Sequence, residues 1–318
     1  LAATAMPATH GQVDFAPGPT EAEVPALFRL TPHRFDFRLT PRQRTGAVVR
    51  CWTVTFPSPV QTPHPNNNRV HCEYFPPQMA GRRPGVVMLH VLGGEFELAR
   101  VCCQALAISG TGALFVKLPY YGPRQQPGVP QRMVSADPDQ TVAGMRQAVL
   151  DIRRAGAWLA TRPEIDPQQL GVAGISLGGI VGALAAAAEP RFTKACLVLA
   201  GGDVGRVAWP SQLPPEVQQY WQDRGLTWDQ VVQRLRAIDP ITYATSLRGR
   251  RVLMINAAHD EVVPRACAEA LWEALGRPEI VWWNSGHITA LTHLPEGLAR
   301  MCAFFQDPSG IPSPSASG

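Results

Sequence analysis

The stretch 170–187, which reads LGVAGISLGGIVGALAAA, constrains the fold more than any other part of the chain. A short apolar run leads at once into Gly174-Ile175-Ser176-Leu177-Gly178, and an alanine-rich segment with high helix propensity follows. The pattern predicts a strand, a sharp turn with Ser176 at its apex, and a helix. Glycines are needed at 174 and 178 because so tight a turn leaves no room for side chains. Ser176 would then lie at a helix N-terminus, where the helix dipole and free N–H groups favour the negative charge that a nucleophile develops.

Continuous apolar runs alternate with helical patterns over most of the chain. Such runs are typical of strands buried on both faces, and their alternation with helices predicts a mostly parallel sheet covered on both sides, an α/β fold. The predicted strands are 85–90, 113–118, 169–173, 194–200, 251–256 and 280–283. The predicted helices are 95–108, 138–161, 177–188, 262–275 and 291–305.

Segments outside this alternation define the expected domain organisation. Residues 1–43 are rich in Pro, Ala and Thr and are expected to form an irregular arm with a short helix near 21–27. The α/β domain would span 44–306, beginning with an antiparallel edge pair, 48–56 and 70–75, joined by an exposed Pro/Asn loop. The remaining residues, 307–318, are expected to form a loose tail.

The segment 203–248 interrupts the alternation between two core strands. It has polar helical spacing and carries four large aromatic residues, Trp209, Tyr220, Trp221 and Trp228. We expect a helical cap insertion whose aromatic side chains wall a pocket at the catalytic edge. The alternative is a helical excursion that packs on the surface.

Composition excludes some functions and leaves the compartment open. The 318-residue chain is 45% hydrophobic and carries a formal charge of +4 without a Lys/Arg run, so nucleic acid is not an expected partner. No apolar stretch reaches membrane-spanning length. The start, Leu1-Ala2-Ala3-Thr4-Ala5, fits either the end of a secretory signal or a small-residue tail, so both a cytoplasmic and a secreted or periplasmic protein remain possible. The sequence does not indicate an oligomeric state.

The seven cysteines show no C-x-x-C spacing typical of a metal site. Most lie in apolar surroundings, where buried thiols are the usual outcome. Cys51 and Cys72 fall in the two neighbouring edge strands and would be able to pair in an oxidising compartment. No His/Asp cluster has ligand spacing either, so neither a metal nor another cofactor is expected.

A serine nucleophile needs a general base, and His287 is the preferred candidate. It follows the last strand in Asn284-Ser285-Gly286-His287, where a loop can bring it over Ser176. His293 falls within the final helix pattern and is expected to be structural. His259 directly precedes the acid candidate and would point away from it.

The base in turn needs a carboxylate that orients its ring, and Asp260 follows strand 251–256 directly. Asp260 can also act as an N-cap for the helix that Pro264 opens. Glu261 and Asp203 are the alternatives. Asp239 precedes a proline and indicates a turn.

Backbone N–H groups at the same edge are expected to form an oxyanion hole. One would come from Leu177, and the other from the turn after strand 85–90, either Leu92 or its neighbour Val91. His90, Tyr120 and Tyr121 are candidate substrate contacts at this edge, because ligands of parallel sheets bind at the carboxyl ends of the strands. As alternatives, His90 would brace the turn and the two tyrosines would be packing residues.

The chain from about 45 to 305 resembles the α/β-hydrolase family. The resemblance rests on His90-Val91-Leu92-Gly93-Gly94, on 166–179 around Ser176, on His259-Asp260-Glu261-Val262-Val263-Pro264, and on Gly286-His287. Within the family the chain is similar to bacterial esterases near the dienelactone hydrolases and acetyl xylan esterases. Dienelactone hydrolases, however, use cysteine where this chain has Ser176. The Val-Leu-Gly-Gly turn also departs from the His-Gly-Gly-Gly of the hormone-sensitive-lipase type.

These features together predict a serine hydrolase that cleaves carboxylic esters of small molecules through an acyl-enzyme. Ser176, Asp260 and His287 would form a Ser-His-Asp catalytic triad in the order expected of an α/β-hydrolase. Two alternatives remain open: a serine peptidase related to prolyl oligopeptidases, and a hydrolase-fold binding protein without catalysis.

Overall fold

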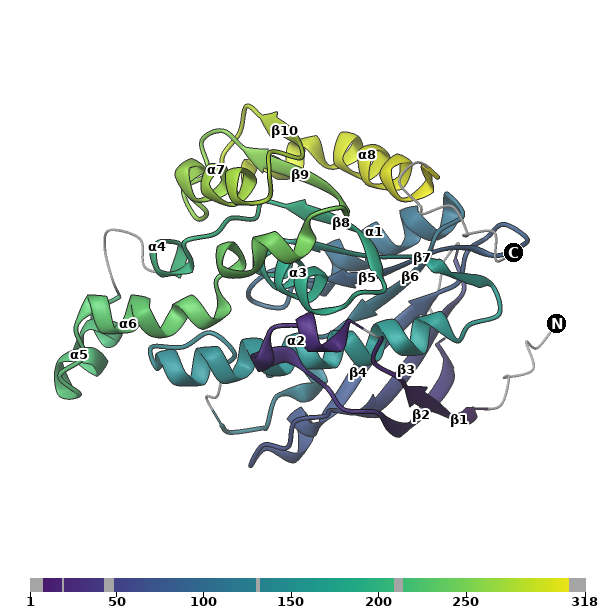
Figure 1. Ribbon diagram of the computed structural model, residues 1–318, viewed down its shortest axis with the longest axis horizontal. Helices are drawn as coiled ribbons and strands as arrows, with labels where there is room; N and C mark the ends of the chain where they lie inside the picture. Colours follow the sequence, from purple (N-terminus) through teal and green to yellow (C-terminus); the bar gives the residue numbers. More distant parts are fainter. Residues whose placement is uncertain (1–7, 19, 43–48, 130–131, 209–213, 309–318) are drawn as a thin grey trace.

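A computed structural model describes residues 8–18, 20–42, 49–129, 132–208 and 214–308 (Figure 1). A single ten-stranded sheet runs through the molecule in the order β1-β2-β3-β4-β6-β5-β7-β8-β9-β10. The strands are β1 (Thr9–Phe15), β2 (His33–Arg42), β3 (Cys51–Pro57), β4 (Arg69–Phe75), β5 (Arg83–Leu89), β6 (Gly112–Val116), β7 (Ile165–Ile175), β8 (Phe192–Val198), β9 (Arg251–Ala257) and β10 (Glu279–Trp283).

The half of the sheet from β6 to β10 is parallel, and the half from β1 to β4 is antiparallel and joins it through β4 and β6. The parallel strands β5 to β9 are buried along almost their whole length, in agreement with their continuous apolar sequences. The predicted α/β architecture with a mostly parallel sheet is therefore confirmed. The carboxyl ends of these six parallel strands lie at one edge, where the loops that follow them can meet.

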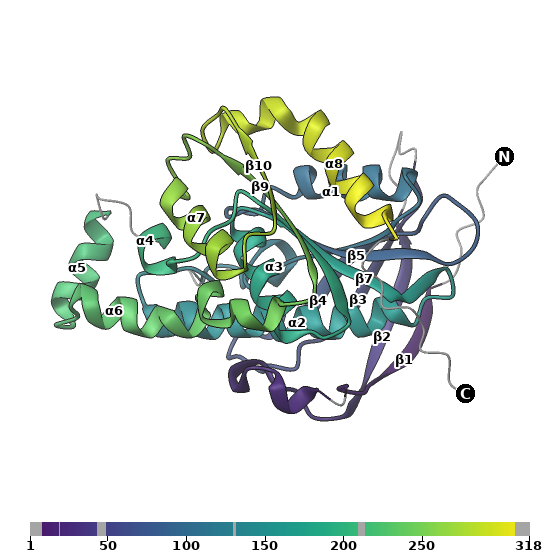
Figure 2. The same ribbon diagram turned by 45° about the horizontal axis from the view of Figure 1, so that its top comes forward.

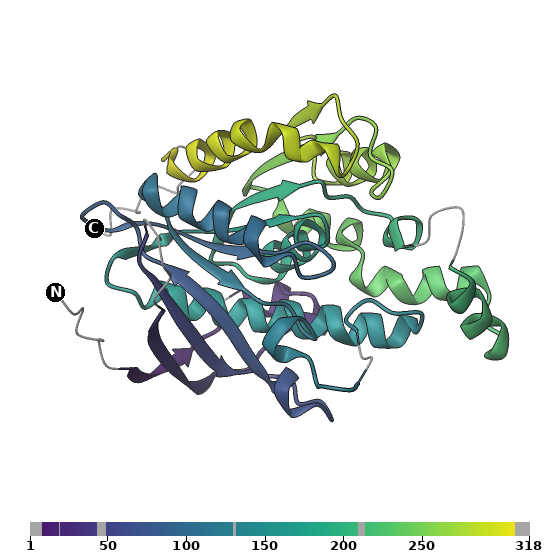
Figure 3. The ribbon, with the colours of Figure 1, turned by 180° about the vertical axis from the view of Figure 1, so that it is seen from behind.

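Helices cover both faces of the sheet (Figures 2 and 3). On one face α1 packs beside α8, and on the other α2 packs beside α3, with α7 next to β9. The helices are α1 (Phe96–Ile108), α2 (Pro138–Ala160), α3 (Leu177–Ala188), α4 (Val204–Ala208), α5 (Pro215–Asp223), α6 (Trp228–Leu235), α7 (Arg265–Ala274) and α8 (Leu294–Gln306). Each face therefore has its own apolar core, and the two cores are separated by the sheet.

The N-terminal segment is more ordered than its composition indicates. Instead of an irregular arm, it contributes β1 and β2, paired antiparallel, with two short 3₁₀ turns at Glu21–Glu23 and Ala26–Phe28 between them. In β1, Val13 and Phe15 alternate with exposed residues, and β2 repeats this pattern. Each strand offers only two strongly buried positions, so the pattern was too short to stand out from a Pro-rich background.

The insertion between β8 and β9 is helical, and none of its described residues, 203–208 and 214–248, lines the cavity at the carboxyl ends of the strands. It contributes α4, α5, α6 and the 3₁₀ segment Pro240–Leu247, which pack along α2, α3 and α7 (Figure 1). Trp221 is buried there, and its indole N–H donates to the Ala136 carbonyl. The expectation that Tyr220, Trp221 and Trp228 wall the pocket is wrong, because none of them lines it. Trp209 lies outside the described residues.

Cys51 and Cys72 are on opposite faces of the sheet. Cys51 belongs to the core under α1, whereas Cys72 belongs to the core under α2. A disulfide requires side chains that approach one another, so these two thiols do not pair. None of the helices in the described part of the chain has both the length and the hydropathy to cross a bilayer.

Candidate active site

The turn between β7 and α3 holds Ser176 in a backbone conformation that side chains rarely adopt, with φ 55° and ψ −117°. Its neighbours need to be glycine for steric reasons. A Cβ on Gly174 would lie 2.1 Å from the Gly178 carbonyl oxygen, and a Cβ on Gly178 would lie 2.6 Å from the His90 carbonyl oxygen. The strained turn lifts Ser176 out of the sheet at the first turn of α3.

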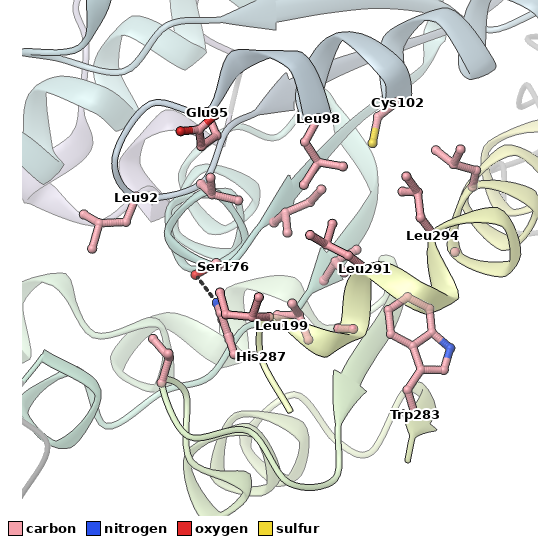
Figure 4. Close-up of a pocket in the computed structure, with 18 of the residues that line it drawn as sticks. Leu92, Glu95, Leu98, Cys102, Ser176, Leu199, Trp283, His287, Leu291 and Leu294 are labelled. Atoms are coloured by element: carbon pink, nitrogen blue, oxygen red, sulfur yellow. Dashed lines mark hydrogen bonds between the residues drawn. The ribbon is translucent and has the colours of Figure 1, made fainter. Parts of the chain in front are cut away.

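The structure brings Ser176, His287 and Asp260 together from three different loops. His287 Nε2 lies 3.0 Å from Ser176 Oγ (Figure 4), and His287 Nδ1 lies 2.8 Å and 2.9 Å from the two carboxylate oxygens of Asp260. With Nδ1–H donating to Asp260, Nε2 is the bare nitrogen that accepts the Ser176 O–H. This is the hydrogen-bond pattern that activates a serine.

Asp260 is fixed by the backbone that follows it. Its Oδ1 accepts hydrogen bonds from the N–H groups of Val262 and Val263, at 2.9 Å and 2.6 Å, and its side chain is buried. The carboxylate therefore caps the turn that leads into α7 and also faces His287, so both roles considered for Asp260 are present. Asp203, the more distant alternative, belongs to the insertion, where Asp239 accepts its backbone N–H.

Glu261 has a role that the sequence did not reveal. Its carboxylate accepts the backbone N–H of His287 at 2.9 Å, so it holds the histidine loop rather than the histidine ring. This hydrogen bond keeps the pKa of Glu261 below its usual range. Glycine at 286 makes the approach possible, because a Cβ there would lie 2.6 Å from the Glu261 carboxylate.

The two residues predicted to supply the oxyanion donors, Leu177 and Leu92, lie near Ser176. Leu177 is the first residue of α3, so its N–H has no carbonyl partner within the helix. Leu92 lies in the turn after β5, which is closed by the hydrogen bond from Gly94 N–H to the Val91 carbonyl. Val91, Leu92 and Ser176 all line the same pocket.

His90 braces this turn and does not contact the pocket. The ring is buried, with Nδ1 2.7 Å from the Val91 carbonyl oxygen and Nε2 accepting the Leu118 N–H at 3.1 Å. Burial lowers the pKa of His90 to about 4, so the ring is neutral near pH 7. Because both ring nitrogens are engaged, we do not retain His90 as a substrate contact.

Tyr120 and Tyr121 are also absent from the pocket wall. Tyr121 packs edge-to-face against His90, with ring centroids 4.9 Å apart, and burial raises its pKa. Tyr120 adopts a positive φ of 65°, and its N–H donates to Asn67 Oδ1. The contacts of both residues are those of packing residues, which is the alternative prediction for them.

The remaining histidines near this edge are structural. His293 stacks on Trp283, with ring centroids 5.2 Å apart, and the ring of His259 is paired with Asn284. Within the described part of the chain, no three His, Cys, Asp or Glu side chains are grouped so as to hold a metal ion.

A largely apolar cavity of about 580 Å³ opens beside Ser176 and His287 (Figure 4). It lies between α1 and α8, above the ends of β7, β8 and β10. Its position was not predicted, because its walls come from segments that look like ordinary core helices in the sequence. Besides Ser176 and His287, the lining residues are Val91, Leu92, Glu95, Leu98, Cys102, Ile175, Val198, Leu199, Val262, Trp283, Ile288, Ala290, Leu291, Leu294, Gly297, Leu298 and Met301.

Comparison with known sequences finds relatives of this site and fold. The pattern of the prolyl oligopeptidase family matches residues 146–309, and that of "alpha/beta hydrolase domain containing 18" matches residues 54–209. A Mycobacterium tuberculosis protein described as uncharacterized is 30% identical over 184 residues, which is 56% of this chain and 42% of that protein. The chain therefore matches less than half the length of that relative.

Solved structures share the architecture at low sequence identity. An acetyl xylan esterase from Paenibacillus sp. R4 superposes with a TM-score of 0.65 at 22% identity, covering 84% of this chain and 87% of the esterase. Acetyl xylan esterase 1 from Thermoanaerobacterium sp. superposes with a TM-score of 0.61 at 20% identity, covering 82% of this chain and 87% of the esterase. The pattern of the prolyl oligopeptidase family spans just over half of the chain, and the fold agrees with it. The chain therefore belongs to the α/β-hydrolases and, within them, to the prolyl oligopeptidase family.

Proposed function

We propose that this α/β-hydrolase is a serine esterase that cleaves carboxylic esters through an acyl-enzyme. The observation that carries the proposal is the continuous hydrogen-bonded path from Ser176 Oγ through the His287 ring to Asp260, at the mouth of an apolar cavity. Each of these three residues has hydrogen-bond partners that fit its proposed chemical role.

In the proposed reaction, Ser176 Oγ attacks the ester carbonyl carbon while His287 Nε2 takes the hydroxyl proton. The carbonyl oxygen gains negative charge, which the N–H groups of Leu177 and Leu92 would stabilise. His287 then returns the proton to the departing alcohol as the bond between the acyl carbon and the alcohol oxygen breaks. Water, deprotonated by His287, then attacks the acyl carbon. The bond from that carbon to Ser176 Oγ breaks, His287 returns the proton to Oγ, and the carboxylic acid leaves, while Asp260 keeps the imidazole oriented throughout.

Membership of the prolyl oligopeptidase family makes a serine peptidase the second candidate. The cavity wall favours the ester, because a bound peptide needs hydrogen-bond partners for its backbone N–H and C=O groups. Among the residues that the structure describes, Glu95 is the only carboxylate on the wall, and it is exposed.

The first test compares wild type and Ser176→Ala on p-nitrophenyl acetate, butyrate and octanoate at neutral to mildly alkaline pH. We expect the variant to lose at least about 10⁴-fold in kcat, because the nucleophile is absent. A fluorophosphonate should label the wild type and not the variant. Faster cleavage of a prolyl p-nitroanilide peptide than of any ester would favour the peptidase. If no substrate is turned over and Ser176 stays unlabelled, a non-catalytic binding protein is the better description.

A further inference from the structure

We propose, on the basis of the esterase function above, that the substrate carries an extended apolar acyl chain. In this proposal the chain lies in the cavity between α1 and α8, and the ester carbonyl lies at Ser176. The reaction steps are those already given, with a fatty or similarly apolar carboxylic acid as the released product.

The walls of the cavity offer an acyl chain apolar contacts on both sides. Leu98 and Cys102 of α1 face Leu291 and Leu294 across it (Figure 4), and Met301 of α8 also lines it. Burial raises the pKa of the Cys102 thiol to about 12, so this sulfur is neutral and behaves as part of the apolar wall. A sugar or charged acid would lose its hydration in this space without gaining hydrogen bonds.

The mouth of the cavity is apolar as well. Leu92, Val262, Ile288 and Leu291 all line the cavity, and each of these side chains is at least 40% exposed. Large apolar side chains left exposed around one opening are typical of a binding site for an apolar ligand. They also provide a surface for the part of a long chain that extends beyond the cavity.

The size of the cavity argues against a short acyl group. About 580 Å³ falls within the range of pockets that hold drug-sized molecules, and an acetyl group would leave most of it unfilled. The acyl carbon becomes bonded to Ser176 Oγ, and Ser176 forms part of the wall, so the acyl chain is the part of the substrate held there in the intermediate. We therefore assign the cavity to the acyl chain rather than to the alcohol.

The experiment measures kcat/KM for p-nitrophenyl esters from acetate to laurate, below their solubility limits. Each buried methylene raises kcat/KM by up to about fourfold, so the burial of four methylenes would raise it by up to about 250-fold. We expect a total rise of at least about 100-fold before the cavity is full. Leu98→Trp and Leu294→Trp, from opposite walls, should abolish most of this rise, measured within each variant as the ratio of kcat/KM for octanoate to kcat/KM for acetate. Ala299→Trp, exposed on α8 away from the wall, is the matched control and should keep the rise.

A binding measurement separates this proposal from the esterase function. The fluorescent fatty acid cis-parinaric acid should bind Ser176→Ala, and adding Leu294→Trp should weaken that binding at least about tenfold, whereas adding Ala299→Trp should not. If acetate is hydrolysed but the chain-length series is flat and parinarate does not bind, the acyl-chain assignment is wrong and the esterase function stands. Parinarate binding without hydrolysis of any ester would overturn the esterase function alone. Faster hydrolysis of octyl acetate than of methyl octanoate would overturn the assignment to the acyl side.

Discussion

Two adjacent carboxylates hold the histidine loop through different atoms. Asp260 contacts the ring of His287, and Glu261 accepts its backbone N–H. The first contact sets the tautomer and orientation of the imidazole, and the second sets where the loop places it. Because Glu261 does not touch the reacting atoms, we regard it as a positioning residue.

Replacing Glu261 tests this positioning role. Loss of a charge-assisted hydrogen bond is worth about 1.5 kcal/mol, so Glu261→Ala should lower kcat about tenfold with little change in KM. Glu261→Gln keeps an acceptor oxygen and should stay within about threefold of wild type. Steady-state kinetics on one p-nitrophenyl ester checks both variants. An equal loss of kcat in Glu261→Ala and Glu261→Gln, or a change confined to KM, would argue against positioning through this hydrogen bond.

At the scale of elements, the first turn of α3 packs directly on the end of β5. Gly178 makes this possible, since any Cβ there would lie within 2.7 Å of the carbonyl oxygens of Leu89 and His90. One turn further along, Gly182 has no neighbour closer than 3.6 Å to the position of a Cβ. Close backbone packing therefore requires glycine at 178, whereas the space around residue 182 accommodates a Cβ.

The two glycines provide a matched pair of variants. Gly178→Ala should destabilise the protein by about 3 kcal/mol and reduce esterase activity, because neither backbone carbonyl can move aside without shifting β5. Gly182→Ala should be neutral or stabilising by up to about 1 kcal/mol, since alanine favours the helix. Urea unfolding gives both values. An unchanged midpoint for Gly178→Ala would show that β5 and α3 separate more easily than their packing indicates.

At the scale of the whole molecule, Arg153 connects the N-terminal segment to the α/β core. Its buried guanidinium donates to the Glu21 carboxylate at 2.8 Å and 2.6 Å, to the Phe28 carbonyl at 2.6 Å, and to Glu189 at 3.1 Å. Arg153 lies on α2, and these partners come from the β1–β2 connection and the C-terminal end of α3. A single side chain thus ties together segments that are far apart in sequence.

Removing this cation should destabilise the whole fold. Arg153→Met removes the 3.1 Å ion pair to the buried Glu189 carboxylate, which then keeps its 3.5 Å ion pair with Arg191, and it also removes the cation that pairs with Glu21. We therefore expect a loss of about 3 kcal/mol in the free energy of unfolding. The exposed pair Arg34–Asp14 serves as the comparison, and Arg34→Ala should leave the urea midpoint unchanged. Similar midpoints for Arg153→Met and wild type would mean that the N-terminal segment does not contribute to stability through this contact.

The sequence by itself determined the parallel core and the identity of the hydrogen-bonded trio. Buried parallel strands are continuously apolar, and the turn at Ser176 requires glycines at fixed offsets, so both leave local patterns. Asp260 and His287 were identifiable because each follows a strand whose end must lie at the same sheet edge. The hydrogen bonds among the three agree with that prediction of proximity.

Only the tertiary structure decided which surfaces the remaining residues face. The insertion has a helical pattern that fits equally well over the site or beside α2, and the contacts of Trp221 placed it beside α2. Leu98 and Leu294 look like core residues of separate helices, and they become opposite walls of one cavity because α1 and α8 pack side by side. Local sequence reports the period and polarity of an element, whereas a cavity depends on the relative placement of elements joined by long-range contacts.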